Sequence, residues 1–168
     1  MTQQKQRRIT LIRHAKAEDD GVTQDHARAL NARGLSDAAA LGDWLRATPA
    51  ALPGLVVCST ATRTRQTLEQ LALGNVPVLL TDRAYLATEE ELLALLQQMD
   101  DAVLHVGLIA HNPGLHQLAA TLAGSYADRA DEDRLLLKFP TSACAQLVFA
   151  LPHWAELASQ QGKLEILR

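Results

Sequence analysis

The sequence predicts an α/β protein, a three-layer αβα sandwich with a mostly parallel central sheet. Short apolar and β-branched runs, the pattern of buried strands, alternate along the chain with segments whose apolar residues recur at helical spacing. Such alternation is typical of a parallel sheet covered by helices on both faces. The 168 residues, 48% hydrophobic and 21% charged, predict a single domain over residues 1–168 with a core of ordinary size.

Six runs are predicted as strands. Four of them follow the alternation and are expected in the parallel part of the sheet: 9–13, 55–58, 76–80 and 103–110. Two later runs, 143–151 and 163–167, are predicted to lie at a sheet edge.

Helical spacing fills the intervals between these strands. It predicts helices over 34–47, 62–73, 89–99 and 115–123. Asn31 is the expected N-cap of the first helix, because its side chain can accept a bond from a free backbone N–H. Gly74 is expected to close the second helix, and Pro113-Gly114 to open the fourth. The charged run 128–134 is predicted to be a solvated loop.

Composition narrows the classes of partner. The net charge of −3 gives no overall attraction to nucleic acid or to an anionic membrane, so neither is expected as a partner. Residues 1–8 are polar, and the apolar run behind them is too short for a signal peptide or a membrane span, so we expect a cytoplasmic protein. Cys58 and Cys144 lack metal-ligand spacing and are predicted as buried small side chains. No sequence feature specifies the oligomeric state.

Polar side chains that a core would not explain stand where predicted strands and loops end. Arg13 and His14 end the first strand, and His111 ends the fourth. Arg28 lies in the loop after the first strand, and Arg63 begins the helix after the second. In a doubly wound sheet these points converge on the rim at the carboxyl ends of the strands, where ligands bind.

Two histidines among arginines predict chemistry on phosphate. Guanidinium groups match and neutralise the peripheral oxygens of a transferring phosphoryl group. A neutral imidazole can attack the phosphorus in line, provided that its other ring nitrogen donates a proton, usually to a backbone carbonyl. The second histidine can donate to an equatorial oxygen. Backbone N–H groups of the helix that starts near Thr62 can help to hold the anion.

These segments resemble the motifs of the histidine phosphatase (phosphoglycerate-mutase-like) superfamily. Leu11-Ile12-Arg13-His14-Ala15-Lys16 is similar to its Arg-His signature, and residues 59–67 are similar to Ser-x-x-x-Arg-x-x-Gln-Thr. Ala110-His111-Asn112-Pro113-Gly114 resembles the segment with the second histidine, and Arg28-Ala29-Leu30-Asn31 before Gly34 resembles Arg-Pro-Leu-Thr-x-x-Gly. The short interval between the third and fourth strands resembles the compact SixA-type phosphohistidine phosphatases.

The resemblance implies a compact phosphoglycerate-mutase-like fold without a cap insertion, and hydrolysis in two steps. His14 would take the phosphoryl group as phosphohistidine, and water would then release phosphate. Arg13, Arg28, Arg63 and His111 would form the phosphate pocket. No metal and no organic cofactor are implied. An uncovered site suits a phosphohistidine-containing protein as the substrate.

The chain departs from the family pattern at two kinds of position. Ala29 and Asn31 stand where proline and threonine are usual, which leaves the charge of Arg28 in place. Many members also use a glutamate after the third strand as a proton donor. The sequence leaves four candidates open for this role: Asp82, Glu89, Glu90 and Glu91. An imidazole leaving group needs less acid assistance than an alkyl phosphate ester does.

Other readings of the same residues remain open. The enzyme could hydrolyse a small phosphorylated metabolite, or the chain could be a phosphate- or phosphoprotein-binding module without turnover. Cys58 could be the nucleophile, but the Cys-x-x-x-x-x-Arg spacing places Thr64 where that chemistry needs arginine. A zinc site at His14 and His111 lacks the usual ligand spacing. Four more histidines carry no motif and are predicted as surface or structural side chains: His26, His105, His116 and His153.

Overall fold

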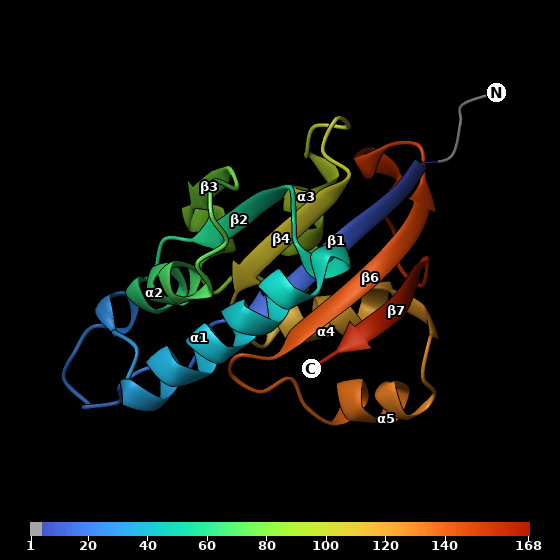
Figure 1. The fold of residues 1–168 in the computed structure, drawn as a ribbon. Helices are drawn as coiled ribbons and strands as arrows, with labels where there is room; N and C mark the ends of the chain where they lie inside the picture. The colour runs from blue at the N-terminus through green and yellow to red at the C-terminus, as the bar shows by residue number, and fades with distance from the viewer. Residues whose placement is uncertain (1–4) are drawn as a thin grey trace.

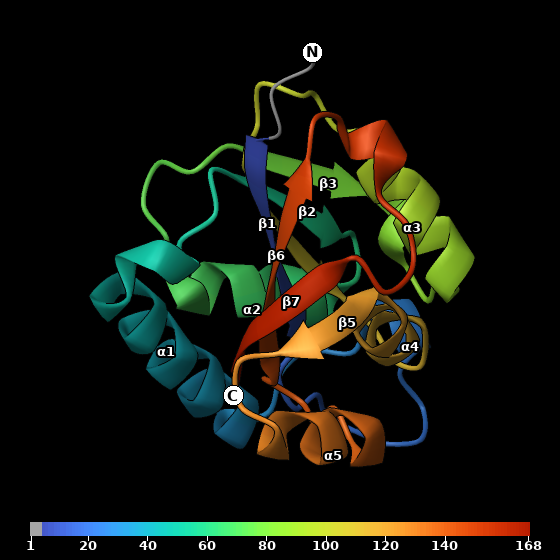
Figure 2. The same cartoon turned by 90° about the vertical axis from the view of Figure 1, so that its right-hand side faces the viewer.

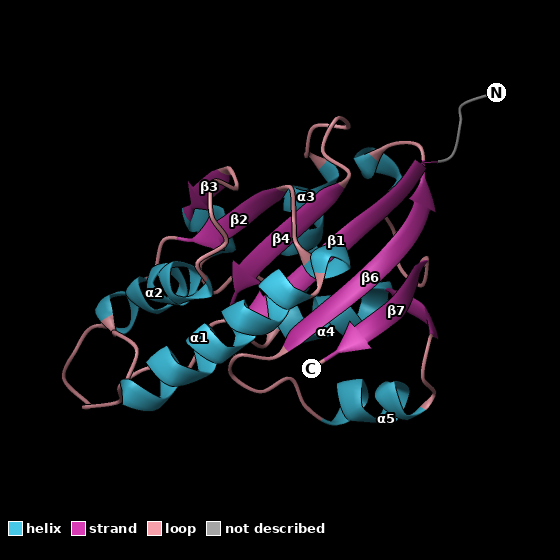
Figure 3. Cartoon of the chain, in the orientation of Figure 1, coloured by secondary structure: helices cyan, strands magenta, loops and turns pink. Residues whose placement is uncertain are grey.

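A seven-stranded sheet forms the centre of the computed structural model, which describes residues 5–168. The first four residues, part of the polar segment 1–8, lie outside the described residues. The strand order is β3-β2-β4-β1-β6-β7-β5 (Figures 1 and 3). The strands are β1 (Lys5–Arg13), β2 (Leu55–Ser59), β3 (Val78–Thr81), β4 (His105–Ala110), β5 (Ala123–Tyr126), β6 (Cys144–Leu151) and β7 (Gly162–Leu167).

Parallel pairing brings the carboxyl ends of the first four strands to one rim. β1 pairs with β4, β4 with β2, and β2 with β3, all in parallel. Arg13 at the end of β1 lies opposite Ala110 at the end of β4, one residue before His111. β6 runs antiparallel to both β1 and β7, so the start of β6 and the end of β7 lie at this same rim. The predicted mostly parallel sheet is confirmed.

Helices cover both faces of the sheet, as the three-layer prediction requires (Figure 2). α1 (Ala32–Ala47) and α2 (Thr62–Leu71) pack on one face through a buried cluster that includes Leu41, Leu45 and Leu71. α3 (Glu89–Gln97) and α4 (Gly114–Leu122) pack on the other face through a larger cluster. α5 (Ala130–Leu137) lies beside α4, where the ring of His116 bonds to the carbonyl of Leu135.

Local sequence explains where α1 begins and how it holds the loop after β1. The Asn31 side chain accepts the Gly34 N–H at 2.8 Å, which confirms the predicted N-cap. A Cβ atom at Gly34 would lie 2.1 Å from the carbonyl oxygen of Lys16, so only glycine lets the helix approach this loop so closely. The start of α1 therefore fixes the chain that follows His14.

Three predictions need correction. The charged run 128–134 is not a loop, because it lies largely within α5, whose first turn carries three acidic side chains that favour a helix N-terminus. β6 and β7 lie inside the sheet because the unpredicted strand β5 takes the edge. Gly74 does not close α2, which ends at Leu71 with Ala72 in the left-handed conformation.

Among residues 5–168, no helix is both long and apolar enough to cross a membrane.

The interval between β3 and β4 holds a single 3₁₀ turn, η3 (Asp82–Ala84), and the helix α3. No further element is inserted there, in agreement with the expected compact form of the fold. The pocket described below is therefore left without a covering segment from this connection.

Candidate active site

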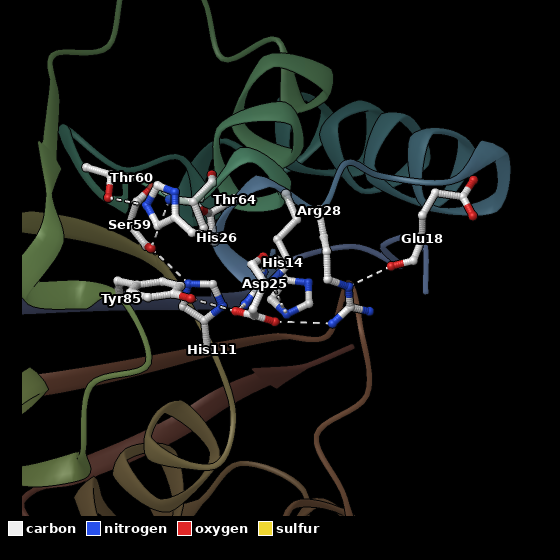
Figure 4. A network of polar contacts seen from close by, with 12 residues as sticks. His14, Glu18, Asp25, His26, Arg28, Ser59, Thr60, Thr64, Tyr85 and His111 are labelled. Carbon is white, nitrogen blue, oxygen red and sulfur yellow. Dashed lines mark hydrogen bonds and ion pairs between the residues drawn. The ribbon is translucent and has the colours of Figure 1, made fainter. Parts of the chain in front are cut away.

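A pocket of about 310 Å³ lies at the carboxyl ends of β1 and β4. Its lining includes all five side chains that the sequence predicts for the site: Arg13, His14, Arg28, Arg63 and His111. They come from the end of β1, the loop after it, the first turn of α2 and the residue after β4. Figure 4 shows His14, Arg28 and His111 facing the same space.

His14 has the tautomer and the orientation of a neutral nucleophile. Its Nδ1 lies 2.7 Å from the carbonyl oxygen of Ala15, to which it donates, so that Nε2 carries the lone pair. Arg63 Nε–H points to this Nε2 at 3.3 Å. Burial, and next the positive charge of Arg63, lower the pKa of His14 to about 4, so the ring is neutral near pH 7.

The Gln-Thr pair of the second motif holds the chain around this histidine. Thr67 Oγ1 accepts the Ala15 N–H at 2.9 Å, and Gln66 Oε1 accepts the Leu30 N–H at 2.7 Å. Both residues belong to α2 and bind segments that follow β1. They position the loops of His14 and Arg28 without facing the pocket themselves.

Arg13 retains an unused donor beside the pocket. Its Nη1 donates to the carbonyl oxygen of Phe139 at 3.0 Å, whereas its buried Nε has no partner among the described residues. Arg28 donates from Nε to the carbonyl oxygen of Glu18 at 2.7 Å. An unpaired buried guanidinium N–H is costly, and an anion in the pocket would supply the missing acceptor.

Arg63 is oriented by a carboxylate that the sequence did not single out. Its Nη1 and Nη2 donate to the backbone carbonyl and to Oδ2 of Asp25, at 2.6 and 2.9 Å. The terminal nitrogens of Arg63 are therefore engaged with Asp25, and its Nε donates to His14 Nε2.

Asp25 links three site residues. It accepts the Tyr85 hydroxyl at 2.7 Å and an Arg28 Nη1 at 3.2 Å, in addition to Arg63 (Figure 4). The Tyr85 hydroxyl bond, and next the arginines, lower the pKa of Asp25 to about 2, so it is an anion at neutral pH. It lies in a charged loop without periodicity, and its place three residues before the motif arginine Arg28 was the only available signal.

His111 is prepared to donate to an anion. Its Nε2 lies 2.8 Å from Ser59 Oγ, which also accepts the Ala61 N–H at 3.4 Å. The hydroxyl proton of Ser59 can then go to Nε2, which places the ring proton on Nδ1. That Nδ1 is buried and has no partner among residues 5–168. Burial, and next Arg63, lower the pKa of His111 to about 3.

None of the four carboxylates predicted as proton-donor candidates lines the pocket. Asp82 accepts a hydrogen bond from Thr60, and Glu91 forms the capping box of α3 with Thr88. Glu89 and Glu90 lie in the first turn of the same helix. The carboxylate among the lining residues is the exposed Asp19.

Two alternative readings do not fit this geometry. Burial raises the pKa of the Cys58 thiol to about 12, which leaves almost no thiolate for nucleophilic attack at neutral pH. Among residues 5–168, His14 and His111 belong to no group of three or more metal-ligating side chains. Arg65 is exposed on α2. His26 is not an isolated surface residue, because its ring contacts Thr60 and the edge of Tyr85.

Comparisons with known proteins agree with this site. The model of the histidine phosphatase superfamily (branch 1) matches residues 9–84. A protein of Mycobacterium tuberculosis strain H37Rv, Rv1276c, is 39% identical over 148 residues, which are 87% of this chain and 91% of the relative.

Solved structures share the whole fold. A chain from Nakamurella multipartitia described as a candidate phosphohistidine phosphatase SixA has a TM-score of 0.85 and 30% identity, and the match covers 98% of this chain and 96% of that one. The corresponding chain from Agrobacterium tumefaciens has a TM-score of 0.78 and 28% identity, with coverage of 96% and 97%. A candidate α-ribazole-5'-phosphate phosphatase from Escherichia coli shares the fold alone, at 17% identity and a TM-score of 0.69 over 96% of both chains.

The motifs run in the order of the family, their side chains line one pocket, and the relatives match nearly the whole chain. The chain belongs to the histidine phosphatase superfamily, in its SixA-type branch.

Proposed function

We propose that this protein is a phosphatase that hydrolyses phosphohistidine on a protein substrate through a covalent phosphohistidine on His14. The observation that carries the proposal is a neutral His14 in the pocket, with Arg63 Nε donating to its Nε2, beside donors on Arg13 and His111 that have no partner among residues 5–168. The first group can attack phosphorus, and the other two can hold phosphoryl oxygens.

The first step transfers the phosphoryl group to the enzyme. His14 Nε2 forms a bond to phosphorus as the bond from phosphorus to the substrate imidazole breaks, and the substrate nitrogen keeps that electron pair and takes a proton from solvent water. Arg13 Nε and His111 Nδ1 donate to the peripheral oxygens, and Arg63 Nε transfers its hydrogen bond from His14 Nε2 to a third oxygen as Nε2 attacks. The Nδ1–H bond of His14 to the Ala15 carbonyl stabilises the positive charge that develops on the ring.

The second step returns the enzyme to its starting state. Water attacks the phosphorus of phosphohistidine, the N–P bond breaks, and inorganic phosphate leaves with the electron pair returned to Nε2. Asp25 lies against Arg63 and Arg28 and reduces the positive charge around the product. This compensation favours release of the phosphate dianion over its retention.

Two observations favour phosphohistidine over a phosphate ester. None of the four candidate carboxylates lines the pocket, and an imidazole leaving group has less need of a strong acid than an alkoxide has. The connection between β3 and β4 also adds no covering segment, so a side chain on a protein surface can reach the pocket. The likeness to chains described as candidate SixA phosphohistidine phosphatases supports the same substrate class.

Rapid quenching of the enzyme with a phosphohistidine protein in alkali, followed by mass spectrometry, tests the proposal. We expect a phosphoryl group on His14 and accumulation of free phosphate. His14→Ala should lower phosphate release by at least about a thousandfold, because the nucleophile is removed, while its circular dichroism stays unchanged. Undiminished hydrolysis by His14→Ala would exclude the proposed intermediate, and hydrolysis of phosphate esters alone would favour a metabolite as substrate.

A further inference from the structure

A second, smaller pocket lies beside the catalytic one. It has a volume of about 130 Å³ and is enclosed by the end of α5, the segment before β6 and the end of β7. In Figure 1 these three parts of the chain gather near the C-terminus. Because β6 and β7 are antiparallel at this point, the pocket lies on the rim of the sheet that carries the active site.

The two pockets share a wall. Phe139 and Pro140 line the small pocket, and Thr141 lines the catalytic one. The carbonyl oxygen of Phe139 accepts bonds from Arg13 Nη1 at 3.0 Å and from Asn112 Nδ2 at 2.8 Å. A ligand that spans both pockets would therefore cross only this short segment.

The small pocket has the size and the character of a seat for one apolar side chain. Leu137, Phe139, Pro140, Ala143 and Leu167 line it. A cavity of about 150 Å³ lined by apolar residues is enough for benzene, whereas cofactor and drug sites need about 300 Å³ or more. Leu137 is 79% exposed at its mouth, which is unusual for a leucine and leaves apolar surface available for a partner.

The rim of this pocket is positively charged. Arg134, Lys138 and Arg168 line it, and no acidic side chain does. Arg134 is partly neutralised by its ion pair with Asp131 at 2.6 Å, and the Arg168 guanidinium lies 5.0 Å from the centre of the Trp44 ring. Lys138 is exposed and forms no ion pair with any residue of 5–168. These charges complement carboxylates on a partner.

We propose that this pocket, lined by Leu137 and Lys138, binds the phosphohistidine protein itself through an apolar side chain that is flanked by acidic residues. This inference rests on the proposed function. It names a part of the protein substrate, distinct from the phosphoryl group, that the enzyme recognises outside the phosphate pocket. The apolar side chain fills the pocket, as anchor residues do in protein interfaces, and the acidic neighbours face the cationic rim.

Phosphohistidine peptides of equal length test this proposal, with free phosphohistidine as the reference substrate. One set carries Leu-Glu-Glu at a series of offsets from the phosphohistidine, and the other carries Ala-Lys-Lys at the same offsets. We expect at least one Leu-Glu-Glu peptide to have a KM about 10-fold lower than its Ala-Lys-Lys partner, the factor that 1.4 kcal/mol of contact energy gives. Free phosphohistidine should not distinguish the variants described next.

Leu137→Asp should abolish the preference, and the neighbouring Leu136→Asp should keep it. Both leucines are exposed on α5, but Leu136 does not line the pocket. Lys138→Glu should transfer the preference from Leu-Glu-Glu to Leu-Lys-Lys peptides. Equal KM values for all peptides, or equal effects of the two aspartate variants, would overturn the inference while leaving the phosphatase intact. Failure of the wild type on every phosphohistidine substrate would overturn the proposed function and this inference together.

Discussion

β1 carries an arginine near each of its ends, and the two differ in how their donors are used. Arg7 is fully buried, and it donates to the carbonyl oxygens of Leu151, Val103 and Pro152 and to the carboxylate of Asp101. Arg13, at the other end, donates to one carbonyl oxygen and keeps a buried Nε that has no partner in the described part of the chain. The first arginine is satisfied by the protein, and the second is arranged for a ligand.

Most of the buried polar atoms without a partner within residues 5–168 also lie near Arg13, whereas one of them, Arg8 Nε, lies next to Arg7. Four buried polar atoms without a partner within residues 5–168 lie at the rim near Arg13, namely Arg13 Nε, His111 Nδ1, Asn112 Oδ1 and Ser142 Oγ. The guanidinium of Arg7 lies 5.0 Å from the centre of the Trp154 ring, and Asp101 also accepts from the Trp154 N–H. Polar groups left unsatisfied in a folded protein require an explanation, and an anionic ligand provides one for the three of these atoms that can donate: Arg13 Nε, His111 Nδ1 and Ser142 Oγ.

Replacement of Arg13 should give the largest effect on activity. Arg13→Leu removes a donor to the phosphoryl group, so we expect kcat/KM for phosphohistidine hydrolysis to fall by about a thousandfold. The free energy of unfolding, measured with urea, should change by less than about 1 kcal/mol, because the side chain makes only one hydrogen bond in the described structure. A large loss of stability with normal activity would reverse the assigned roles of the two arginines.

Replacement of Arg7 should give the opposite result. Arg7→Leu leaves several buried acceptors without a donor, so we expect the free energy of unfolding to fall by about 3 kcal/mol. The folded fraction should hydrolyse phosphohistidine at the wild-type rate. Arg33→Leu serves as the control, because its exposed side chain pairs only with Asp37 on the surface of α1. A loss of kcat in fully folded Arg7→Leu would contradict the comparison.

Replacement of Asp25 by a neutral residue of the same shape should show the effect of its charge on phosphate binding. Asp25→Asn removes the anion that pairs with Arg63 and Arg28, so inorganic phosphate should bind more tightly, with an inhibition constant about 10-fold lower. Release of product should slow at the same time, which lowers kcat. Asp37→Asn, remote on α1, is the matched control. An unchanged inhibition constant in Asp25→Asn would show that Asp25 does not offset the charge of the pocket.

Histidine titration gives the smallest expected effect, and it compares the two histidines at the rim with one inside the fold. Burial lowers the pKa of His14 and of His105, whose Nε2 bonds to Thr10 Oγ1 inside the fold, to about 4 each, and that of His111 to about 3. In NMR titrations all three rings should stay neutral down to about pH 5. Phosphate should raise the pKa of His14 and His111 by adding a nearby anion, and leave His105 unchanged. Equal shifts at all three histidines would argue against a phosphate site at the rim.

The same pKa values predict how the free energy of unfolding changes with pH. A histidine whose folded-state pKa lies below 6.5 binds fewer protons in the folded state than in the unfolded chain. Its contribution is therefore complete above about pH 6.5 and is lost as the pH falls from about 6.5 toward 4 for His14 and His105, and toward 3 for His111. Phosphate should reduce this loss, because it favours protonation of the folded state at the rim.

The sequence by itself determined the alternation of strands and helices and the segments that meet at the pocket. Apolar runs and helical spacing depend on near neighbours in the chain, and so does the cap that Asn31 gives to α1. The motifs placed His14, Arg63 and His111 at strand and helix ends. In a parallel sheet those ends must share one rim, which explains why these positions could be predicted from the chain alone.

Only the tertiary structure decided which groups complete the site and which strand lies at the edge of the sheet. Asp25 and the carbonyl oxygen of Phe139 come from segments without periodicity, and the bond from Arg13 to Phe139 joins residues 126 positions apart. The position of β6 between β1 and β7, and the edge strand β5 with its Gly124, follow from pairing between distant segments. Such contacts depend on the packed fold, because no local pattern specifies which distant donor or strand will be the neighbour.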